Sequence, residues 1–440
     1  MEPTIATCPD TEAFNAFLRT RGEPAWLLEN RRRAWESYRA LPWPDRGDEE
    51  WSRTDIRQFR PRQFSIPPAA VDGPPGFTDM PSATLADGVD LGGQVIVANG
   101  RPVATGLADK WHACGVVFGE LSEATRNGGD RLRPYLERRV VDPGYDKFAA
   151  LATACWSTGH LLLVPRGVAV TEPLHAFSGL ADGQTDLSRS VVILEEGAEA
   201  TLLCETASFD ESGGGLHCGT LELILQPAAR LRIVHLQNWG RSTWHFAHHK
   251  AVLARDASLQ WTVAAMGSRL AKVNQHVALL ESGADCQVNG VIFTEGKQHI
   301  AYHTLQHHMA PRGRSDFLYK SALQEKSRTV WRGMIKVDPD AQQTDGYQRN
   351  DTLMLSDSAR ADSIPGLEIQ ADNVRCTHGS TTGRVDDEQV FYAQCRGFTR
   401  KEATRAIVAG FFQQIFDRIT IGSVRDALGL AIAKRVRAYE

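Results

Sequence analysis

Cys376 and His378 have the clearest chemical potential in the sequence, because a single threonine separates this thiol from this imidazole. If the segment is a β-strand, the two side chains project from one face, about 7 Å apart along the chain. Cysteine and histidine together favour zinc or iron-sulfur species over magnesium or calcium. The pair therefore predicts half of a soft-metal or sulfur site. The competing interpretation is a buried cysteine beside a hydrogen-bonded histidine.

The 14 histidines include two clusters, at residues 245–249 and 303–308. Equivalent positions on stacked strands lie about 4.8 Å apart, so such clusters allow a ladder of imidazoles that binds a metal. The other interpretation places them as hydrogen-bonded side chains on the outer faces of the strands.

Common catalytic signatures are missing from the sequence. Five residues, instead of four, separate Gly290 from Gly296, and Gln298 stands where a magnesium-binding Ser or Thr is needed, which excludes a P-loop ATPase. The sequence also contains no G-x-S-x-G and no H-E-x-x-H motif.

The composition is that of an ordinary globular protein. The 440 residues are 42% hydrophobic and 23% charged, with a formal net charge of -4, so nucleic acid and anionic membranes are not expected partners. Eight scattered cysteines without a C-x-x-C pair predict a reduced, cytoplasmic chain. We expect no signal peptide and no membrane span, because no basic start or run of roughly 20 apolar residues is present.

A repeat organises the middle of the chain, where short β-like runs alternate with polar turns. A large apolar residue is followed four positions later by Ala, Gly or Ser, first at intervals of 27–31 residues and later of 14–18. This spacing predicts the corners of a β-solenoid, with two corners per coil carrying the signal late in the series. A β-sandwich with regular hairpins is the alternative. The pairs are Leu163/Gly167, Leu194/Ala198, Leu225/Ala229, Leu253/Ala257, Leu280/Ala284, Met309/Gly313, Leu323/Ser327, Val337/Ala341 and Leu355/Ala359.

The flanking regions differ from this middle. Helical spacing is expected over 1–40, an extended connector over 41–55, a linker over 60–90, and a hairpin with its turn at Asn99-Gly100. Helical spacing returns after 388, with a capping box formed by Thr399 and Glu402. The predicted division is 1–150, 151–385 and 386–440.

Several segments resemble the signatures of the SufB/SufD family of iron-sulfur cluster assembly scaffolds. The segments 367–379, 382–392 and 395–398 match the C-terminal signature of the family, which is highly specific. The segment 41–55 is similar to the N-terminal signature. Residues 245–249 and 344–346 look like internal landmarks of the family, so the similarity spans nearly the whole chain.

The resemblance implies a mainly β protein: a right-handed parallel β-helix core flanked by N-terminal and C-terminal helical regions. It also implies a non-catalytic, cytoplasmic subunit that pairs with SufB and with the SufC ATPase and receives sulfur indirectly from a donor system. The implied cluster is transient and shared with SufB, with no cofactor bound stably to the chain alone. A homodimer is a further possibility.

Site roles follow from the same resemblance. His378 is expected to face the SufB interface as a ligand of the nascent cluster, and Cys376 matches a cysteine common in the motif. The C-terminal helix is expected to dock the ATPase, although its apolar stripe is also typical of an intramolecular core. The docking residues are Lys401, Arg405, Phe411 and Phe412.

Two departures separate the SufB and SufD types. Asn350 stands where SufB-type scaffolds carry a cysteine, and Gly379 stands where they carry a glutamate after the histidine. The chain therefore resembles the SufD type. Two other readings stay open: a β-helix enzyme acting on carbohydrate, and a homodimeric metal-binding scaffold.

Overall fold

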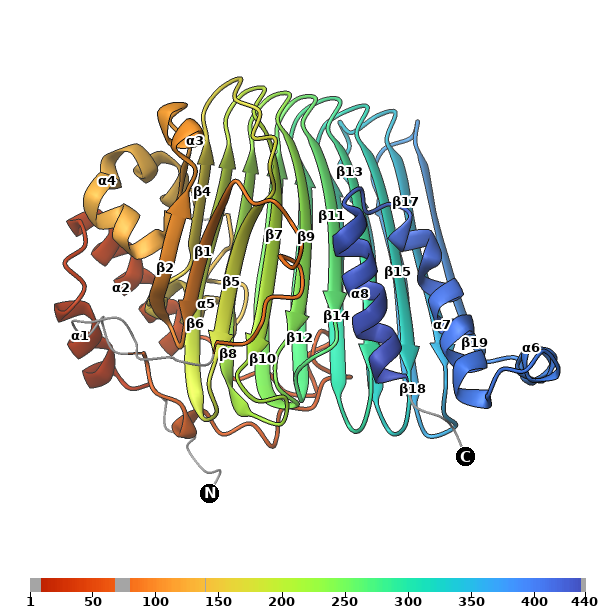
Figure 1. Ribbon diagram of the computed structural model, residues 1–440. Helices are drawn as coiled ribbons and strands as arrows, with labels where there is room; N and C mark the ends of the chain where they lie inside the picture. The colour runs from red at the N-terminus through yellow and green to blue at the C-terminus, as the bar shows by residue number, and fades with distance from the viewer. Residues whose placement is uncertain (1–8, 68–79, 139, 437–440) are drawn as a thin grey trace.

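A two-sheet parallel β-solenoid forms the centre of the protein in the computed structural model, which describes residues 9–67, 80–138 and 140–436 (Figure 1). Odd-numbered strands from β5 onward pair in parallel in one sheet and even-numbered strands from β4 onward in the other, giving about eight coils. The predicted solenoid is confirmed, and the sandwich alternative is wrong. The strands are β4 (His160–Val164), β5 (Leu174–Leu180), β6 (Gln184–Leu194), β7 (Glu199–Ser208), β8 (Gly214–Leu225), β9 (Arg230–Asn238), β10 (Ser242–Leu253), β11 (Ser258–Ala265), β12 (Leu270–Leu279), β13 (Asp285–Thr294), β14 (His299–His308), β15 (Arg314–Leu323), β16 (Arg328–Val337), β17 (Asp345–Met354), β18 (Arg360–Ile369) and β19 (Arg375–Arg384).

The small residues of the repeat lie at the corners between strands. Ala198, Ala229, Ala257 and Ala284 are fully buried at one corner, each just before an odd-numbered strand. Ser327 and Ala359 lie at the opposite corner, before even-numbered strands. The shorter late intervals therefore come from two corners per coil, as predicted. A small side chain is needed because successive corners stack closely against the interior core.

The N-terminal end of the solenoid is closed. The hairpin β1 (Gly93–Ala98) and β2 (Arg101–Leu107) extends one sheet, and β3 (Val117–Glu120) extends the other. Asn99 and Gly100 both have positive φ, as the predicted turn requires. Trp111 of helix α3 (Asp109–Ala113) and Phe118 of β3 join the interior core, so these elements seal the tube.

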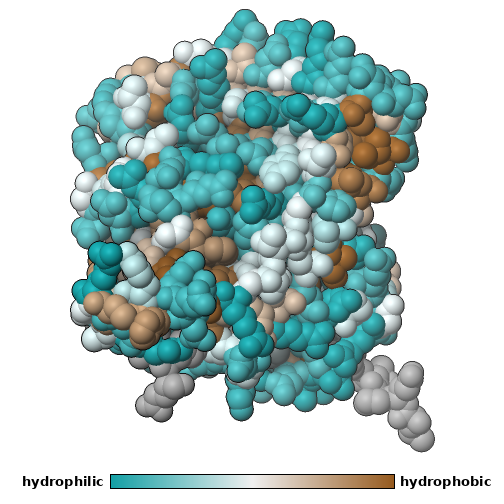
Figure 2. Space-filling model, turned by 90° about the vertical axis from the view of Figure 1, so that its right-hand side faces the viewer, coloured by the Kyte–Doolittle hydropathy of each residue, from teal (hydrophilic) through white to brown (hydrophobic). Residues whose placement is uncertain are grey.

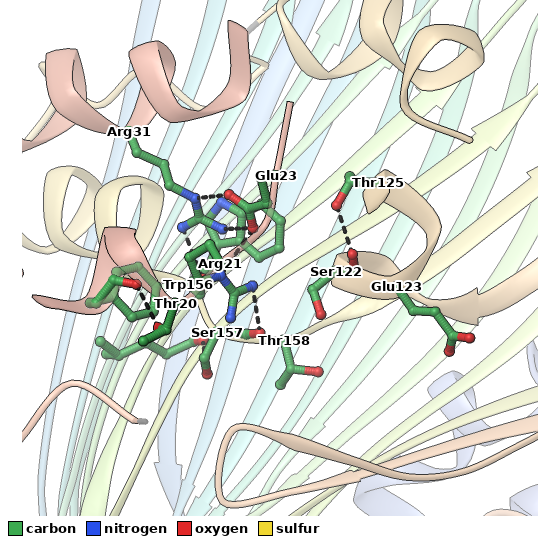
Figure 3. Close-up of polar contacts among 12 residues, drawn as sticks. Thr20, Arg21, Glu23, Arg31, Ser122, Glu123, Thr125, Trp156, Ser157 and Thr158 are labelled. Atoms are coloured by element: carbon green, nitrogen blue, oxygen red, sulfur yellow. Dashed lines mark hydrogen bonds and ion pairs between the residues drawn. The ribbon is translucent and has the colours of Figure 1, made fainter. Parts of the chain in front are cut away.

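Helices gather around this closed end (Figure 1). They are α1 (Thr11–Arg19), α2 (Ala25–Ala40), α4 (Leu121–Leu136) and α5 (Lys147–Cys155). Figure 3 shows the ion network that links α2 and the segment before it to the end of α5. Glu23 accepts hydrogen bonds from Arg31 Nε and Nη2, both at 2.7 Å, and from Arg21 Nε at 3.0 Å. Arg31 also donates to the carbonyl of Trp156 at 2.9 Å.

The predicted connector and linker run over the surface. Residues 41–55 form turns and extended backbone with Trp51 buried, and a short 3₁₀ helix follows at Pro61–Gln63. Part of the predicted linker, 68–79, lies outside the described residues.

The C-terminal region contains α6 (Asp387–Cys395), α7 (Arg400–Phe416) and α8 (Gly422–Arg435). Helices α7 and α8 lie along the outer face of the odd-numbered sheet, whereas α6 stands beyond the last coil (Figure 1). The predicted capping box of Thr399 and Glu402 is present. In the described parts of the chain, no helix is long and apolar enough to cross a bilayer.

Candidate functional site

The C-terminal end of the solenoid is open, because among the described residues no element covers β18 and β19. Most residues of these two strands are partly or fully exposed, unlike those of the preceding coils. Figure 2 views the molecule from this side and shows a mainly hydrophilic surface with separate hydrophobic patches. Among the exposed apolar side chains at this end are Tyr347, Leu367 and Ile369. We call the inward-facing residues of the last strands the mouth. They are Gln348 and Asn350 of β17, Ser363, Leu367 and Ile369 of β18, and Cys376, His378 and Ser380 of β19.

Cys376 and His378 both belong to the mouth. Cys376 packs against the small apolar cluster that includes Ile335 and Val337, and it pairs with Gly346 across the sheet. His378 lies two residues further along β19, opposite Gln348, and is exposed. Alternation along the strand puts both side chains on the same face. The sequence prediction of their placement is therefore consistent with the structure.

The thiol of Cys376 is half-buried. Burial raises the pKa of Cys376, and the backbone hydrogen bond at Gly346 offsets part of that effect. The group is therefore a protonated thiol at neutral pH and a weak nucleophile. A metal ion would have to displace its proton on binding.

Polar side chains to which the sequence analysis gave no role in the site complete the mouth. Ser380 on β19 donates to Ser363 on β18 at 2.8 Å, and Asn350 Nδ2 donates to the same Ser363 at 3.0 Å. Gln348 Nε2 donates to the carbonyl of Gly366 at 3.0 Å. The buried oxygens Gln348 Oε1 and Asn350 Oδ1 have no hydrogen-bond partner. Alternation along a strand could have indicated these positions. Ser380 lies two residues after His378 on the same face of β19, and Gln348 and Asn350 lie opposite His378 and Ser380 on β17.

The described residues of the mouth do not form a metal site by themselves. In the part of the chain that the structure describes, no three His, Cys, Asp or Glu side chains are arranged to hold a metal ion. Cys376 and His378 supply two donors, and soft-metal sites use about four. A cluster held here would therefore need ligands other than the described residues of the mouth.

Ion pairs fix the outer side of the last coils. Asp362 on β18 contacts Arg328 at 2.6 Å, Arg360 at 3.1 Å and Arg53 of the connector at 3.1 Å. The connector therefore reaches from the closed end of the molecule to the edge of the mouth and holds β18 in place.

The four residues predicted to dock an ATPase fall into two groups. Lys401 is exposed and Arg405 partly exposed on α7. Phe412 is fully buried against the solenoid and Phe411 partly so, with the Phe411 carbonyl accepting a hydrogen bond from Lys320 at 3.0 Å. The exposed aromatic residues of the C-terminal region lie on or just after α6; they are Phe391, Tyr392 and Phe398.

Strand alternation divides each histidine cluster between two faces. His245 and His249 of β10 point into the solenoid, whereas His248 points outward and bonds Asp146 at 3.0 Å. In the second cluster, His307 bonds Asp338 at 3.0 Å and His308 bonds Ser315 at 2.8 Å. Neither the ladder nor the outer-face interpretation describes a whole cluster.

Comparisons with known proteins indicate the same family for both halves of the chain. Residues 177–411 match the family model for the SUF system FeS cluster assembly SufBD core domain, and residues 15–176 match that for the SufBD protein N-terminal region. An iron-sulfur cluster assembly SufBD family protein of Mycobacterium tuberculosis is 33% identical over 304 residues, covering 67% of this chain and 75% of the relative. The iron-sulfur cluster assembly protein SufB of Bacillus subtilis is 25% identical over 411 residues, covering 91% and 88%.

Proposed function

The chain belongs to the SufBD family of iron-sulfur cluster assembly proteins, and from this premise we propose that it is a SufD-type scaffold subunit in the cytoplasm. In this proposal it pairs with SufB and carries the SufC ATPase, without catalysing a reaction itself. The observation that carries the proposal is the exposed, two-donor mouth formed by Cys376 and His378.

The mouth supports a shared cluster. Asn350 occupies the position of the SufB-type cysteine, so this position offers no thiolate. The Asn350 side chain is buried and hydrogen-bonded to Ser363. His378 would supply one ligand, and a partner would supply the thiolate ligands that complete the site. The cluster is the cargo of the assembly, held transiently between two chains and lost when they separate.

Docking of the ATPase fits the outer surface of the C-terminal helices. Phe411 and Phe412 hold α7 on the solenoid, so the contact surface is assigned to Lys401, Arg405 and the exposed aromatic residues of α6. Because α6 projects beyond the last coil, movement of an ATPase bound there would be transmitted to the mouth.

The first experiment tests His378. The chain is co-expressed with SufB and SufC, purified without oxygen, and analysed by light scattering and visible absorption. We expect a complex whose iron-sulfur absorbance is lost in His378→Ala, while the exposed control His112→Ala keeps it. Full cluster content in His378→Ala would remove this residue from the site.

The second experiment tests the docking surface. Lys401→Glu and the pair Phe391→Ala with Tyr392→Ala should reduce co-purification of SufC without lowering the melting temperature. Arg131→Glu, an exposed charge reversal near the closed end, is the matched control. Undiminished SufC recovery with both docking variants would place the contact elsewhere.

Self-association is a second candidate, favoured by the apolar residues exposed at the mouth. An uncovered coil that accepts a paralogue also accepts a second copy of the chain, giving a two-fold dimer. Light scattering of the chain purified alone distinguishes a dimer from a monomer.

A further inference from the structure

A groove of about 740 Å³ is formed by the connector and the short 3₁₀ helix that follows it. All of its lining residues belong to 43–46 and 54–62, so it contains no residue of the mouth or of the C-terminal helices. Its volume lies in the range of roughly 300–1,000 Å³ that is typical of ligand-binding sites. We call it the connector groove.

The floor of the connector groove is apolar. Phe59 is buried in the core beneath the groove. Trp43 and Ile56 are half-buried and pack against the same core, so part of each side chain stays open to the groove. Pro44 and Pro61 are half-buried and also line it. This floor offers a place for one apolar side chain of a ligand.

The floor is held in place before any ligand binds. The centroid of the Trp43 ring lies 5.8 Å from that of Phe148 and 6.2 Å from that of Phe59. The Lys147 ammonium lies 5.3 Å from the centroid of the Trp43 ring, and its Nζ donates to the carbonyl of Leu41 at 2.6 Å. A preformed groove loses little conformational entropy on binding, which favours affinity.

The rim of the connector groove carries an excess of positive charge. Its lining includes four exposed arginines and two aspartates, although the whole chain has a formal net charge of -4. The groove therefore has the opposite sign of charge from the chain as a whole. The charged residues are Arg46, Arg57, Arg60 and Arg62, with Asp45 and Asp55.

Most of these guanidinium groups have no counter-charge. Within the described residues only Arg57 forms an ion pair, at 2.7 Å from Asp55. Arg60 donates to the backbone carbonyl of Arg57 at 2.5 Å, whereas Arg46 and Arg62 make no such contact in the described part of the chain. Arginine binds carboxylates strongly, because it donates two parallel hydrogen bonds to them.

Positive charge continues on the far side of Arg57. This residue also lines a neighbouring hollow, together with Arg241, Arg269 and Lys297. Arg241 pairs with Glu295 at 3.0 Å, but Arg269 and Lys297 have no ion pair among the described residues. A ligand longer than the connector groove therefore meets further positive charge.

We propose that the connector groove binds an acidic peptide segment of a partner protein. One apolar side chain of the segment enters the groove, and carboxylates on either side of it contact Arg46, Arg60 and Arg62. Complementary charge attracts and orients such a segment, and the buried apolar side chain anchors it. The proposal does not depend on the proposed function, because it uses neither the mouth nor the C-terminal helices.

A peptide fits this groove better than single-stranded nucleic acid, which also binds to basic surfaces with aromatic residues. Bases stack on open aromatic faces, but the Trp43 ring already contacts the rings of Tyr38, Phe59 and Phe148. The half-buried side chain of Ile56 and the two prolines beside it offer no flat aromatic face.

The test uses the whole chain and fluorescein-labelled nonapeptides, with binding followed by fluorescence anisotropy. Each peptide has a central Leu, Ile, Phe or Trp between Asp and Glu residues. One reference set carries Gly at the centre, and another carries Lys in place of the acids. We expect the acidic peptides with an apolar centre to bind at least about tenfold more tightly than either reference set. Their affinity should fall between about 0.05 and 0.5 M salt, because salt screens exposed charges.

Two charge reversals locate the peptide. Arg46→Glu with Arg62→Glu should weaken binding at least about tenfold, because the peptide then meets like charge. Arg131→Glu with Arg138→Glu is the matched control, since it makes the same change in charge at two exposed positions outside the groove, and it should bind the peptides as the parent chain does.

The proposal is overturned if no acidic peptide with an apolar centre binds, or if Arg46→Glu with Arg62→Glu binds it as tightly as the parent chain while circular dichroism shows both to be folded. Equal affinity for the Gly-centred peptides also overturns it, because the groove would then have no part in binding. Tighter binding of single-stranded oligothymidine than of any peptide would identify a nucleic-acid surface instead. If the double variant does not fold, each single reversal replaces it, and unchanged affinity in both overturns the proposal as well.

Discussion

The two ends of the solenoid are built differently. At the closed end, Trp111 and Phe118 seal the interior and helices cover the first coils. At the open end, β18 and β19 leave Leu367 and Ile369 exposed. The terminal coils of a solenoid need a cap with a polar outer face to remain soluble. The closed end is therefore stabilised within the chain, whereas the open end is free for the contact with another chain that the proposed function requires.

The ion pairs at the two ends differ in the same way. The Glu23 and Arg31 side chains are almost fully buried, and the Arg31 guanidinium lies 3.8 Å from the centroid of the Trp156 ring. At the open end, Arg375 pairs with Asp345, but the arginine is largely exposed. Buried pairs are costly to break from one side, whereas exposed pairs contribute little.

The largest effect is expected at the closed end. Glu23→Ala leaves Arg21 and Arg31 buried without their counter-charge, so we expect a loss of about 3–5 kcal/mol in the free energy of unfolding. Urea denaturation measures it. Glu29→Ala, which removes an exposed pair with Arg33, is the control and should cost about 0.5 kcal/mol or less. Equal losses for both variants would contradict the contrast between buried and exposed ion pairs.

An intermediate effect is expected at the corners. Ala198→Leu overfills a fully buried corner near the closed end. It should lower the free energy of unfolding by about 1–3 kcal/mol. Ala359→Leu makes the same change in the last coils, where the neighbouring strand is exposed and can yield, so its cost should be smaller. Thermal denaturation compares the two variants; a larger loss for Ala359→Leu would mean that the last coils are packed as tightly as the first.

Acidification should lower the free energy of unfolding through the buried histidines. Burial lowers the pKa of His160, His299 and His308 to about 4. Between about pH 6.5 and 4 the unfolded chain binds more protons at these residues than the native chain, so stability falls as pH falls through this window.

The measurement is the free energy of unfolding by urea at pH 7 and pH 5. A His160→Gln, His308→Gln variant should lose less stability between these two values than the parent chain. An identical drop in both chains would assign the acid sensitivity to other groups.

The smallest effect on stability is expected at the mouth. Leu367→Asp with Ile369→Asp changes exposed positions, so the free energy of unfolding should change by about 0.5 kcal/mol or less. Association at the open end, with SufB or with a second copy, should nevertheless be lost, as measured by light scattering. Retained association would move the contact away from the mouth.

Much of the fold was predictable from local pattern. The repeat of large and small residues predicted the corners, including the change to two corners per coil, because close stacking excludes large side chains there. The Asn99-Gly100 turn and the capping box at Thr399 were predictable because each depends on residues within a few positions.

The candidate site was predictable only in part. Cys376 and His378 were found because they are neighbours on one strand. Their exposure, and the contacts of Ser363 with Asn350 and Ser380, depend on the absence of a further coil over the described open end, which no local pattern encodes.

The sequence by itself predicted the solenoid, its helical flanks and the Cys376–His378 pair as a candidate soft-metal site, because periodicity and residue type are local properties. Only the tertiary structure decided which histidines face inward, because a one-residue change of register would exchange the two faces of a strand. It also decided that Arg31 meets the carbonyl of Trp156, 125 residues away, since such contacts arise only when distant segments pack together.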